Sequence, residues 1–328
     1  MIESKDIGFV EKVSLTVLVD NKADLIVDST ETVKYFTKKP LLAEHGLSVL
    51  LQTDDSDERI LWDAGVSKVA LIENMRRMKL GFQTISKIAL SHGHNDHYAA
   101  MTTILNEMGL SPEVKEWGKT VSQEDINTWV TKSQVPLVSH PAAFRERWWK
   151  KDDGTLVGPM LPPPRQEWEA AGAKIILSKE PYKLAQGCWT TGYIPRKSFE
   201  KVGRPTQLLY RSGSDFIPDD LDEDQAIVIN VKDKGLIILS GCAHSGIVNT
   251  VNYAKKFTGV DRVHAIIGGF HLARANDDEI TKTIDLIKKE KPTHVIPSHC
   301  TGFQAISKFA QEMPDEFIEG VVGTTYIL

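Results

Sequence analysis

The chain has 328 residues, with 39 Lys and Arg against 44 Asp and Glu, so its formal charge is −5. Its 41% hydrophobic and 25% charged content is that of a globular protein and excludes a disordered or fibrous chain. The mild acidity argues against a broad surface for nucleic acid or for an anionic membrane. We therefore expect a small-molecule substrate, while the oligomeric state stays open.

The N-terminal sequence and the cysteines indicate a compartment. Glu3 and Asp6 stand where a secretory signal needs a basic and then an apolar stretch. No apolar run approaches the roughly 18 residues of a membrane span. Cys188, Cys242 and Cys300 are an odd number at distant positions and imply no disulfide framework. We expect a cytoplasmic protein.

Apolar runs of strand length alternate with segments of helical period along most of the chain, which favours a mixed α/β layered sandwich. In chain order the pattern predicts a hairpin from Leu47–Leu51 and Ile60–Asp63, strands at Ile85–Leu90 and Val135–Val138, a hairpin from Ala226–Val231 and Leu236–Leu239, a helix through Ile280, Ile284 and Ile287 with Asp277 and Asp278 as caps, and a strand at Val295 and Ile296.

Two stretches are rich in Pro and Gly, Gly154–Arg165 and Tyr193–Pro218, and they read as loops or lids. We expect one domain over 1–328, with loop insertions near 141–170 and 193–220. Trp148 and Trp149 could wall a pocket or stack on a planar substrate, or they could be the buried aromatic face of a helix.

The strongest chemical signal is the run from Ser91 to His97, with sequence SHGHNDH, directly after a predicted buried strand. His92 and His94 alternate onto one side of an extended segment, so both can face one ion. Asp96 and His97 follow the turn and can reach a second ion. Imidazole and carboxylate together suit zinc, iron or manganese.

The pattern His-x-His-x-Asp-His resembles the signature of the metallo-β-lactamase superfamily, whose fold is a four-layered αββα sandwich with a dinuclear metal site. Asp63, in the run LWDAG, resembles the strand-end aspartate that orients the ligand loop in that family. The resemblance implies two ligand sets, His92, His94 and His140 for the first ion and Asp96, His97 and His299 for the second.

One position departs from the family pattern. Where the superfamily places a metal-bridging aspartate after a Gly, this chain has Gly241 followed by Cys242. Cys242 could bind metal as a thiolate, or it could be buried as a small apolar residue. His244, two residues further, could take over part of the bridging role.

Further segments resemble one branch of the superfamily. That branch includes the archaeal dihydropterin–ribofuranosylaminobenzene phosphate synthases and many metal-dependent hydrolases. The segments that carry the resemblance are GYIPR at 192–196, DQA at 224–226, GCAHSG at 241–246, GGFHL at 268–272 and HCTG at 299–302.

The resemblance implies a metal-dependent hydrolase with two divalent ions, most often zinc, that activates water against a phosphoester, lactone or thioester. Asp96 would orient that water, and His271 could act as a general acid, contact substrate or be structural. Arg196 could bind a phosphate or carboxylate of the substrate. The alternatives are a pterin-condensing transferase that releases pyrophosphate, and a non-catalytic metal-binding or sensing protein.

Overall fold

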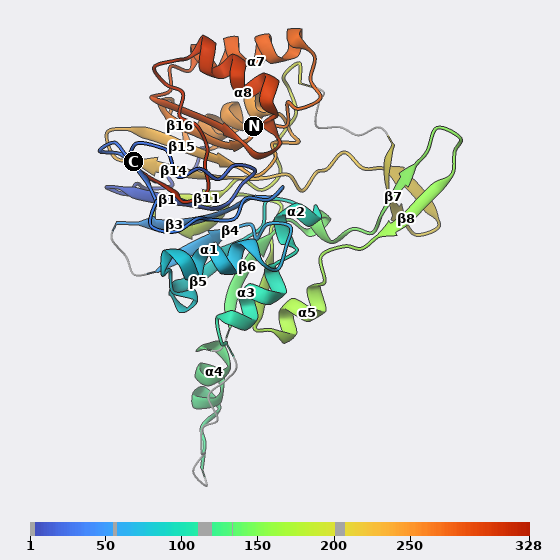
Figure 1. Ribbon diagram of the computed structural model, residues 1–328. Helices are drawn as coiled ribbons and strands as arrows, with labels where there is room; N and C mark the ends of the chain where they lie inside the picture. Colours follow the sequence, from blue (N-terminus) through green and yellow to red (C-terminus); the bar gives the residue numbers. More distant parts are fainter. Residues whose placement is uncertain (1–3, 55–57, 111–119, 133, 201–206) are drawn as a thin grey trace.

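The computed structural model describes residues 4–54, 58–110, 120–132, 134–200 and 207–328. Two β-sheets are stacked face to face (Figure 1). In spatial order the eight-stranded sheet consists of β2 (Val33–Tyr35), β18 (Thr324–Ile327), β1 (Val13–Val19), β3 (Ser48–Thr53), β4 (Arg59–Trp62), β5 (Ile85–Ala89), β6 (Val135–Ser139) and β9 (Ala173–Leu177). The six-stranded sheet consists of β10 (Tyr182–Ala185), β11 (Cys188–Thr190), β14 (Ala226–Val231), β15 (Gly235–Ser240), β16 (Val263–Gly269) and β17 (His294–Ser298).

Helices cover the outer face of each sheet. The helices on the eight-stranded sheet are α1 (Ala70–Met78), α3 (Met101–Glu107) and α5 (Arg165–Ala170). Those on the six-stranded sheet are α6 (Ile247–Thr258), α7 (Asp277–Lys289) and α8 (Phe303–Glu312). A central core between the sheets contains Leu15 and Leu51 from one sheet and Ile229 and Ile237 from the other. These layers confirm the predicted αββα sandwich.

The predicted hairpins and the predicted helix form, with small differences at their ends. In the first hairpin Val49 of β3 lies opposite Trp62 of β4, while residues 55–57 of its turn lie outside the described part of the chain. Helix α7 is capped by Asn276, which forms a capping box with Glu279. Asp277 and Asp278 were expected to cap it but lie in its first turn, where their charges favour the positive end of the helix dipole.

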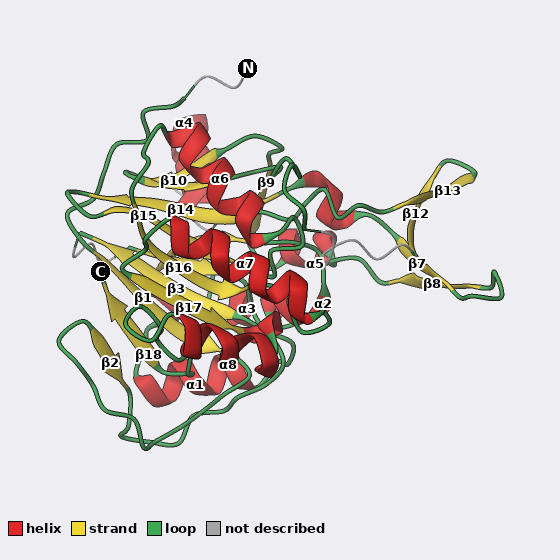
Figure 2. Cartoon of the chain, turned by 90° about the horizontal axis from the view of Figure 1, so that it is seen from above, coloured by secondary structure: helices red, strands yellow, loops and turns green. Residues whose placement is uncertain are grey.

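The topology brings many strand ends to one edge of the sandwich. Strands β4, β5 and β6 are parallel in one sheet, and β15, β16 and β17 are parallel in the other. Figure 2 shows β15, β16 and β17 from above, with α6 and α7 lying across them. Because parallel strands end at the same edge, the polar segments that follow them are gathered there. The short helix α2 (Asn95–Tyr98) follows β5 at this edge.

The two stretches predicted as loops contain strands, which corrects that expectation. Four strands form a separate sheet that projects from the body as an arm (Figures 1 and 2). Its strands in order are β13 (Asp215–Pro218), β12 (Leu208–Ser212), β7 (Arg147–Lys150) and β8 (Leu156–Met160). Trp148 and Trp149 therefore lie on a strand, not on a helix. The local Pro and Gly content hid this sheet because β7 pairs with β12, about sixty residues further along the chain.

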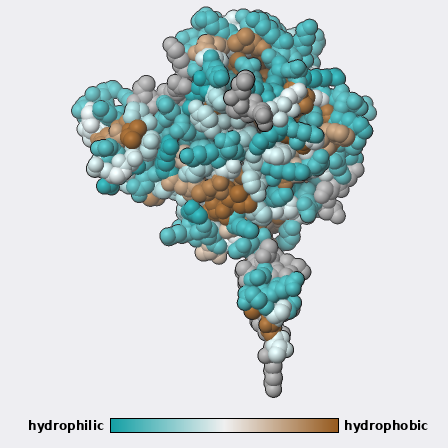
Figure 3. Space-filling view, turned by 180° about the vertical axis from the view of Figure 1, so that it is seen from behind, coloured by the Kyte–Doolittle hydropathy of each residue, from teal (hydrophilic) through white to brown (hydrophobic). Residues whose placement is uncertain are grey.

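The arm is thin, and several of its apolar side chains are exposed. Val157, Leu161 and Phe216 are among them, and an apolar patch is visible on the arm at the left of Figure 3. Helix α4 (Gln123–Lys132) also points away from the body (Figure 1). Within the described ranges, every helix is too short or too polar to cross a membrane. The boundaries of a single domain over 1–328 remain a prediction.

Candidate metal centre

Asp63 fixes the ligand loop, residues 91–97, through hydrogen bonds to both of its ends. Its Oδ1 accepts a hydrogen bond from the Ser91 backbone N at 2.7 Å, and its Oδ2 accepts one from Ser91 Oγ at 2.7 Å. His97 Nδ1 lies 2.7 Å from the same Oδ2, and both side chains are fully buried. With Nδ1 donating to Asp63, the other nitrogen of His97 is free to bind a metal.

Small residues let the loop pack this closely. A Cβ on Gly241 would lie 2.3 Å from Ser91 Oγ, and a Cβ on Gly93 would lie 2.2 Å from the Ala143 carbonyl oxygen. Either clash would displace the loop that carries the histidines. These glycines therefore fix the loop between the two sheets.

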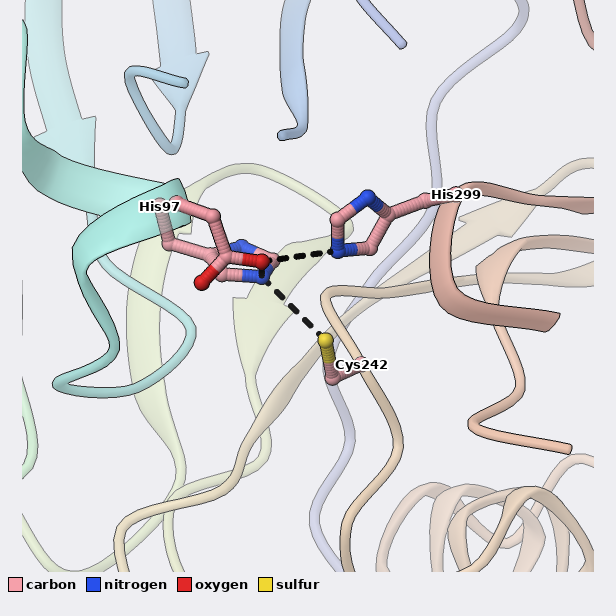
Figure 4. A group of neighbouring side chains, drawn as sticks. His97, Cys242 and His299 are labelled. Atoms are coloured by element: carbon pink, nitrogen blue, oxygen red, sulfur yellow. Dashed lines mark hydrogen bonds and ion pairs between the residues drawn. The ribbon is translucent and has the colours of Figure 1, made fainter. Parts of the chain in front are cut away.

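A first group of potential ligands consists of Asp96, His97, Cys242 and His299, whose ligand atoms lie within 4.8 Å of one another. Asp96 Oδ2 is 3.3 Å from His299 Nε2, and His97 Nε2 is 3.2 Å from Cys242 Sγ. Figure 4 shows His97, Cys242 and His299 pointing toward one another from three separate segments. The Nδ1 of His299 is buried and lacks a hydrogen-bond partner among the described residues, while its Nε2 faces Asp96. A buried imidazole with so few partners fits a metal ligand.

A second group consists of His92, Cys242 and His244. His92 Nε2 lies 3.2 Å from His244 Nε2, and the ring of His94 lies 4.5 Å from that of His92 and 4.8 Å from that of His244. Cys242 belongs to both groups, at the position where the family has its bridging aspartate. The donor sets of the two groups, imidazole with thiolate and carboxylate, fit divalent transition metals.

His140 was predicted as a ligand beside His92 and His94, but the structure does not bring it into either group. Its Nδ1 accepts a hydrogen bond from the Ala142 backbone N at 3.2 Å. His244 lies beside His92 instead. The sequence left His244 open as a candidate, and its signal was the segment around Cys242.

Burial and charge set the protonation of the group members. Burial lowers the pKa of His92 and His244 well below the usual value and that of His94 to about 4, so these rings are neutral. Burial also opposes a charge on His97, but Asp96 and Asp63 outweigh it and raise its pKa to about 10. His97 and His299 hold the pKa of Asp96 well below its usual range despite burial.

A cavity of about 770 Å³ opens over these groups. The arm forms one wall with Trp149, Met160 and Leu208. The rest of the lining is mostly polar and contains His45, His94, His244, His271, His299 and Cys300. His45, exposed in this part of the lining, has its Nε2 3.5 Å from Asp96 Oδ2. The arm therefore supplies one wall of the cavity over the ligand groups.

Of two further residues predicted to contact substrate, His271 lies at the cavity and Arg196 does not. His271 lines the cavity, with its ring 4.2 Å from that of His244. Arg196, predicted to bind substrate, is not among the residues that line it. Its side chain is buried, and its Nη2 donates to the Leu221 carbonyl oxygen at 3.0 Å. Arg196 thus contacts the segment that follows β13 and helps to hold it in place.

Sequence reasoning gave no role to Arg147, which is buried at the base of the arm. Its Nε donates to Asp219 Oδ2 at 2.8 Å, and its Nη2 donates to Glu223 Oε1. Arg147 thus ties β7 to the segment that follows β13. The sequence signal was one charged residue beside two tryptophans.

The chain is similar to known proteins in sequence and in fold. No model of a protein family matches the chain. It is 31% identical over 283 residues to 7,8-dihydropterin-6-methyl-4-(β-D-ribofuranosyl)-aminobenzene-5'-phosphate synthase from Methanocaldococcus jannaschii, a match that covers 85% of this chain and 88% of that one.

Two solved structures share the fold. One is described as a metal-dependent hydrolase of the β-lactamase superfamily, with a TM-score of 0.69, 19% identity and coverage of 95% of this chain and 98% of that one. The other is the metallo-β-lactamase fold protein YhfI from Bacillus subtilis, with a TM-score of 0.52, 10% identity and coverage of 97% and 100%.

Proposed function

This chain belongs to the metallo-β-lactamase superfamily, and we propose that it is a metal-dependent synthase that joins a dihydropterin to a ribofuranosylaminobenzene phosphate and releases pyrophosphate. The observation that carries the proposal is the 31% identity over 85% of the chain to a synthase of that product. The ligand groups and the fold both agree with a metal-dependent enzyme of this superfamily. The reaction itself is the step that we propose.

We assign one ion to the first ligand group, with Asp96, His97 and His299 as ligands. We assign the other ion to the second ligand group, with His92, His244 and the neighbouring His94 as ligands. Cys242 is shared between the two ions. His244 takes the place predicted for His140 in this assignment. Zinc suits these ligands best, and iron or manganese are the alternatives. Divalent ions bound here would stabilise the negative charge of a departing pyrophosphate.

The cavity walls suit planar and anionic substrates. Trp149 lies on the arm and faces the cavity beside Leu208, so its ring can stack on a pterin or an aminobenzene ring. Arg274, exposed at the rim, can pair with a phosphate. The volume is that of a site for small molecules, which supports a small-molecule substrate over a macromolecular one.

Hydrolysis by a metal-activated water, the first expectation from the sequence, is the second candidate. It is favoured by Asp96, whose side chain is 20% exposed while His97 and His299 beside it are buried. Water can therefore reach this carboxylate, which remains our predicted catalytic residue for orienting it. Phosphoesters, lactones and thioesters would be the substrates of such an enzyme.

The test is to load the protein with zinc, iron or manganese and supply a pterin pyrophosphate with and without a ribofuranosylaminobenzene phosphate. Pyrophosphate release and the coupled product are followed by mass spectrometry. Release that requires the second substrate supports the synthase. Release without it, or turnover of simple esters alone, supports the hydrolase and overturns the proposal.

A further inference from the structure

Two of the three cysteines meet at the cavity wall. Cys242 follows β15, and Cys300 follows β17, so the parallel strands bring both to the same edge. Their sulfur atoms and a ring nitrogen of His271, which follows β16, lie within 4.8 Å of one another. This third group shares only Cys242 with the two groups assigned above.

A glycine makes the approach of the two thiols possible. Gly269 is the last residue of β16, and a Cβ there would lie 2.6 Å from Cys300 Sγ and 3.2 Å from the Cys242 Cα. Cys300 Sγ also lies 3.5 Å from the Cys242 carbonyl oxygen. Any larger residue at 269 would push Cys300 away from its partner. The close pair is thus built into the backbone.

The group is buried on one side and open on the other. Cys242 is 3% exposed, whereas His271 and Cys300 are half-buried and line the cavity. The Nδ1 of His271 is buried and has no hydrogen-bond partner in the described part of the chain. His271 also has a left-handed backbone, with φ of 50°. Few L residues adopt that conformation without a compensating interaction.

We propose that Cys242, His271 and Cys300 form an additional site for a thiophilic divalent cation, with zinc and cadmium as the class of ion. Two sulfurs and one imidazole are soft ligands that select such ions over magnesium or manganese. Zinc takes ligands at about 2.3 Å for sulfur and about 2.0–2.1 Å for nitrogen, so small side-chain movements close the group around an ion.

The fourth position of a tetrahedral ion held by this group would face the cavity that His271 and Cys300 line, so water or a substrate atom could occupy it. This gives His271 a ligand's role in place of the acid or substrate-contacting role predicted from the sequence. The site goes beyond the proposed synthase reaction and does not depend on it, because the ligands bind metal whichever reaction the protein performs.

Cadmium titration of the full chain tests the site through the sulfur-to-metal charge-transfer absorbance, which reports thiolate ligands directly. The wild type is expected to show the band of two thiolates. Cys300→Ser should lose about half of that band, and Cys188→Ser none, because Cys188 is buried in the central core. An unchanged band in Cys300→Ser would overturn the proposal.

A second measurement needs no variant. The wild type is alkylated with iodoacetamide with and without zinc, and the modified cysteines are mapped by mass spectrometry. Zinc is expected to slow modification of Cys300 at least tenfold. Equal modification of Cys300 with and without zinc would exclude it as a ligand, even if Cys242 were protected by the other two groups.

Discussion

Asp20 accepts a hydrogen bond from the backbone N of His299 through Oδ1 at 3.0 Å, although 279 residues separate the two in the chain. Asn21 supports the same residue, since its Nδ2 donates to the His299 carbonyl oxygen at 3.0 Å. His299 has φ of 49°, a left-handed conformation that costs free energy for a residue with a side chain. The segment after β1 therefore fixes the backbone that aims His299 at Asp96.

Replacing Asp20 tests this positioning. Asp20→Ala removes the acceptor, so the His299 backbone can relax and its ring should leave the first ligand group. We expect zinc affinity to fall about tenfold, the lower end of the effect of residues that orient metal ligands. Isothermal titration with zinc measures it. Asp20→Asn should restore most of the affinity because its side-chain oxygen can still accept the hydrogen bond.

Asp28→Asn, an exposed change in the same segment, serves as the matched control and should leave zinc binding unaltered. If Asp20→Ala bound zinc as tightly as this control, the hydrogen bond would have no role in placing His299.

Asp96→Asn keeps the shape of the side chain but removes the negative charge that offsets a divalent cation. Asp96 is shared between His97 at 3.5 Å and His299 at 3.3 Å, so its loss affects the whole first group. We expect one ion per chain to be lost and turnover to fall by about 10²-fold or more, the scale of removing a group that acts in the transition state. Metal analysis and steady-state rates measure both. Two ions and near-normal rates would show that Asp96 is not a ligand.

Chelation should abolish activity without unfolding the protein. The central core between the sheets and the two layers under the helices are apolar clusters that include none of the ligand-group residues. Small domains that fold around a metal have no such core. Far-UV circular dichroism should therefore stay native after dialysis against a chelator. Cooperative unfolding on mild chelation would mean that the ions hold the fold together.

The parts predicted from sequence depend on local patterns. The run from Ser91 to His97 carries its ligands within seven residues, and the hairpin turn before Gly235 is set by a left-handed glycine with φ of 103°. Each pattern needs only its own neighbours to be recognised. That is why the two hairpins, the αββα layers and the resemblance to the family could be deduced without coordinates.

The parts that escaped prediction depend on contacts between distant segments. His244 lies beside His92, 152 residues away, only because β15 and β5 end at the same edge of the sandwich. The arm is a sheet because Trp149 pairs with Leu208 across 59 residues. Local composition cannot encode such a register, so the arm read as loops and the position of His244 beside His92 could not be deduced.

His264 provides a test of pH dependence away from the metal groups. It lies in β16, is 7% exposed, and its Nδ1 is 3.0 Å from Thr293 Oγ1. Burial, with smaller contributions from nearby His294 and Lys234, lowers the pKa of His264 to about 4. Because the unfolded chain binds a proton near pH 6.5, stability from this residue is intact above that pH and is lost as the pH falls toward 4.

His264→Gln removes this titration. Between pH 7.5 and pH 5.5 we expect the free energy of unfolding of the wild type to fall by about 1 kcal/mol more than that of the variant. Urea denaturation at the two pH values measures it, and the comparison cancels the other histidines. Parallel losses in the two proteins would show that His264 is protonated equally well in the folded state.

Arg147 connects the arm to the body and to the ligand loop. It pairs with Asp219 and Glu223, both fully buried, and a Cβ on Gly93 would lie 3.0 Å from its Nη1. Burial raises the pKa of Glu223 to about 7, against the opposing charge of Arg147. Removing the arginine would leave the buried Glu223 without its partner, and Asp219 with Arg145 as its remaining counter-charge, beside the loop that carries His92 and His94.

We therefore expect Arg147→Met to lower the free energy of unfolding by about 3–5 kcal/mol, the usual cost of breaking a buried ion pair from one side. The loss should be smaller at pH 6 than at pH 8, because Glu223 can take up a proton at pH 6 and then needs no counter-charge.

Arg211→Met is the matched control, since Arg211 lies on the same arm but is exposed, and it should change stability by less than about 0.5 kcal/mol. Urea denaturation of the three proteins at both pH values measures these differences, and substrate KM reports whether Trp149 still covers the cavity. Equal stability of Arg147→Met and Arg211→Met would mean that the arm is held by its apolar contacts, with the buried ion pairs contributing nothing.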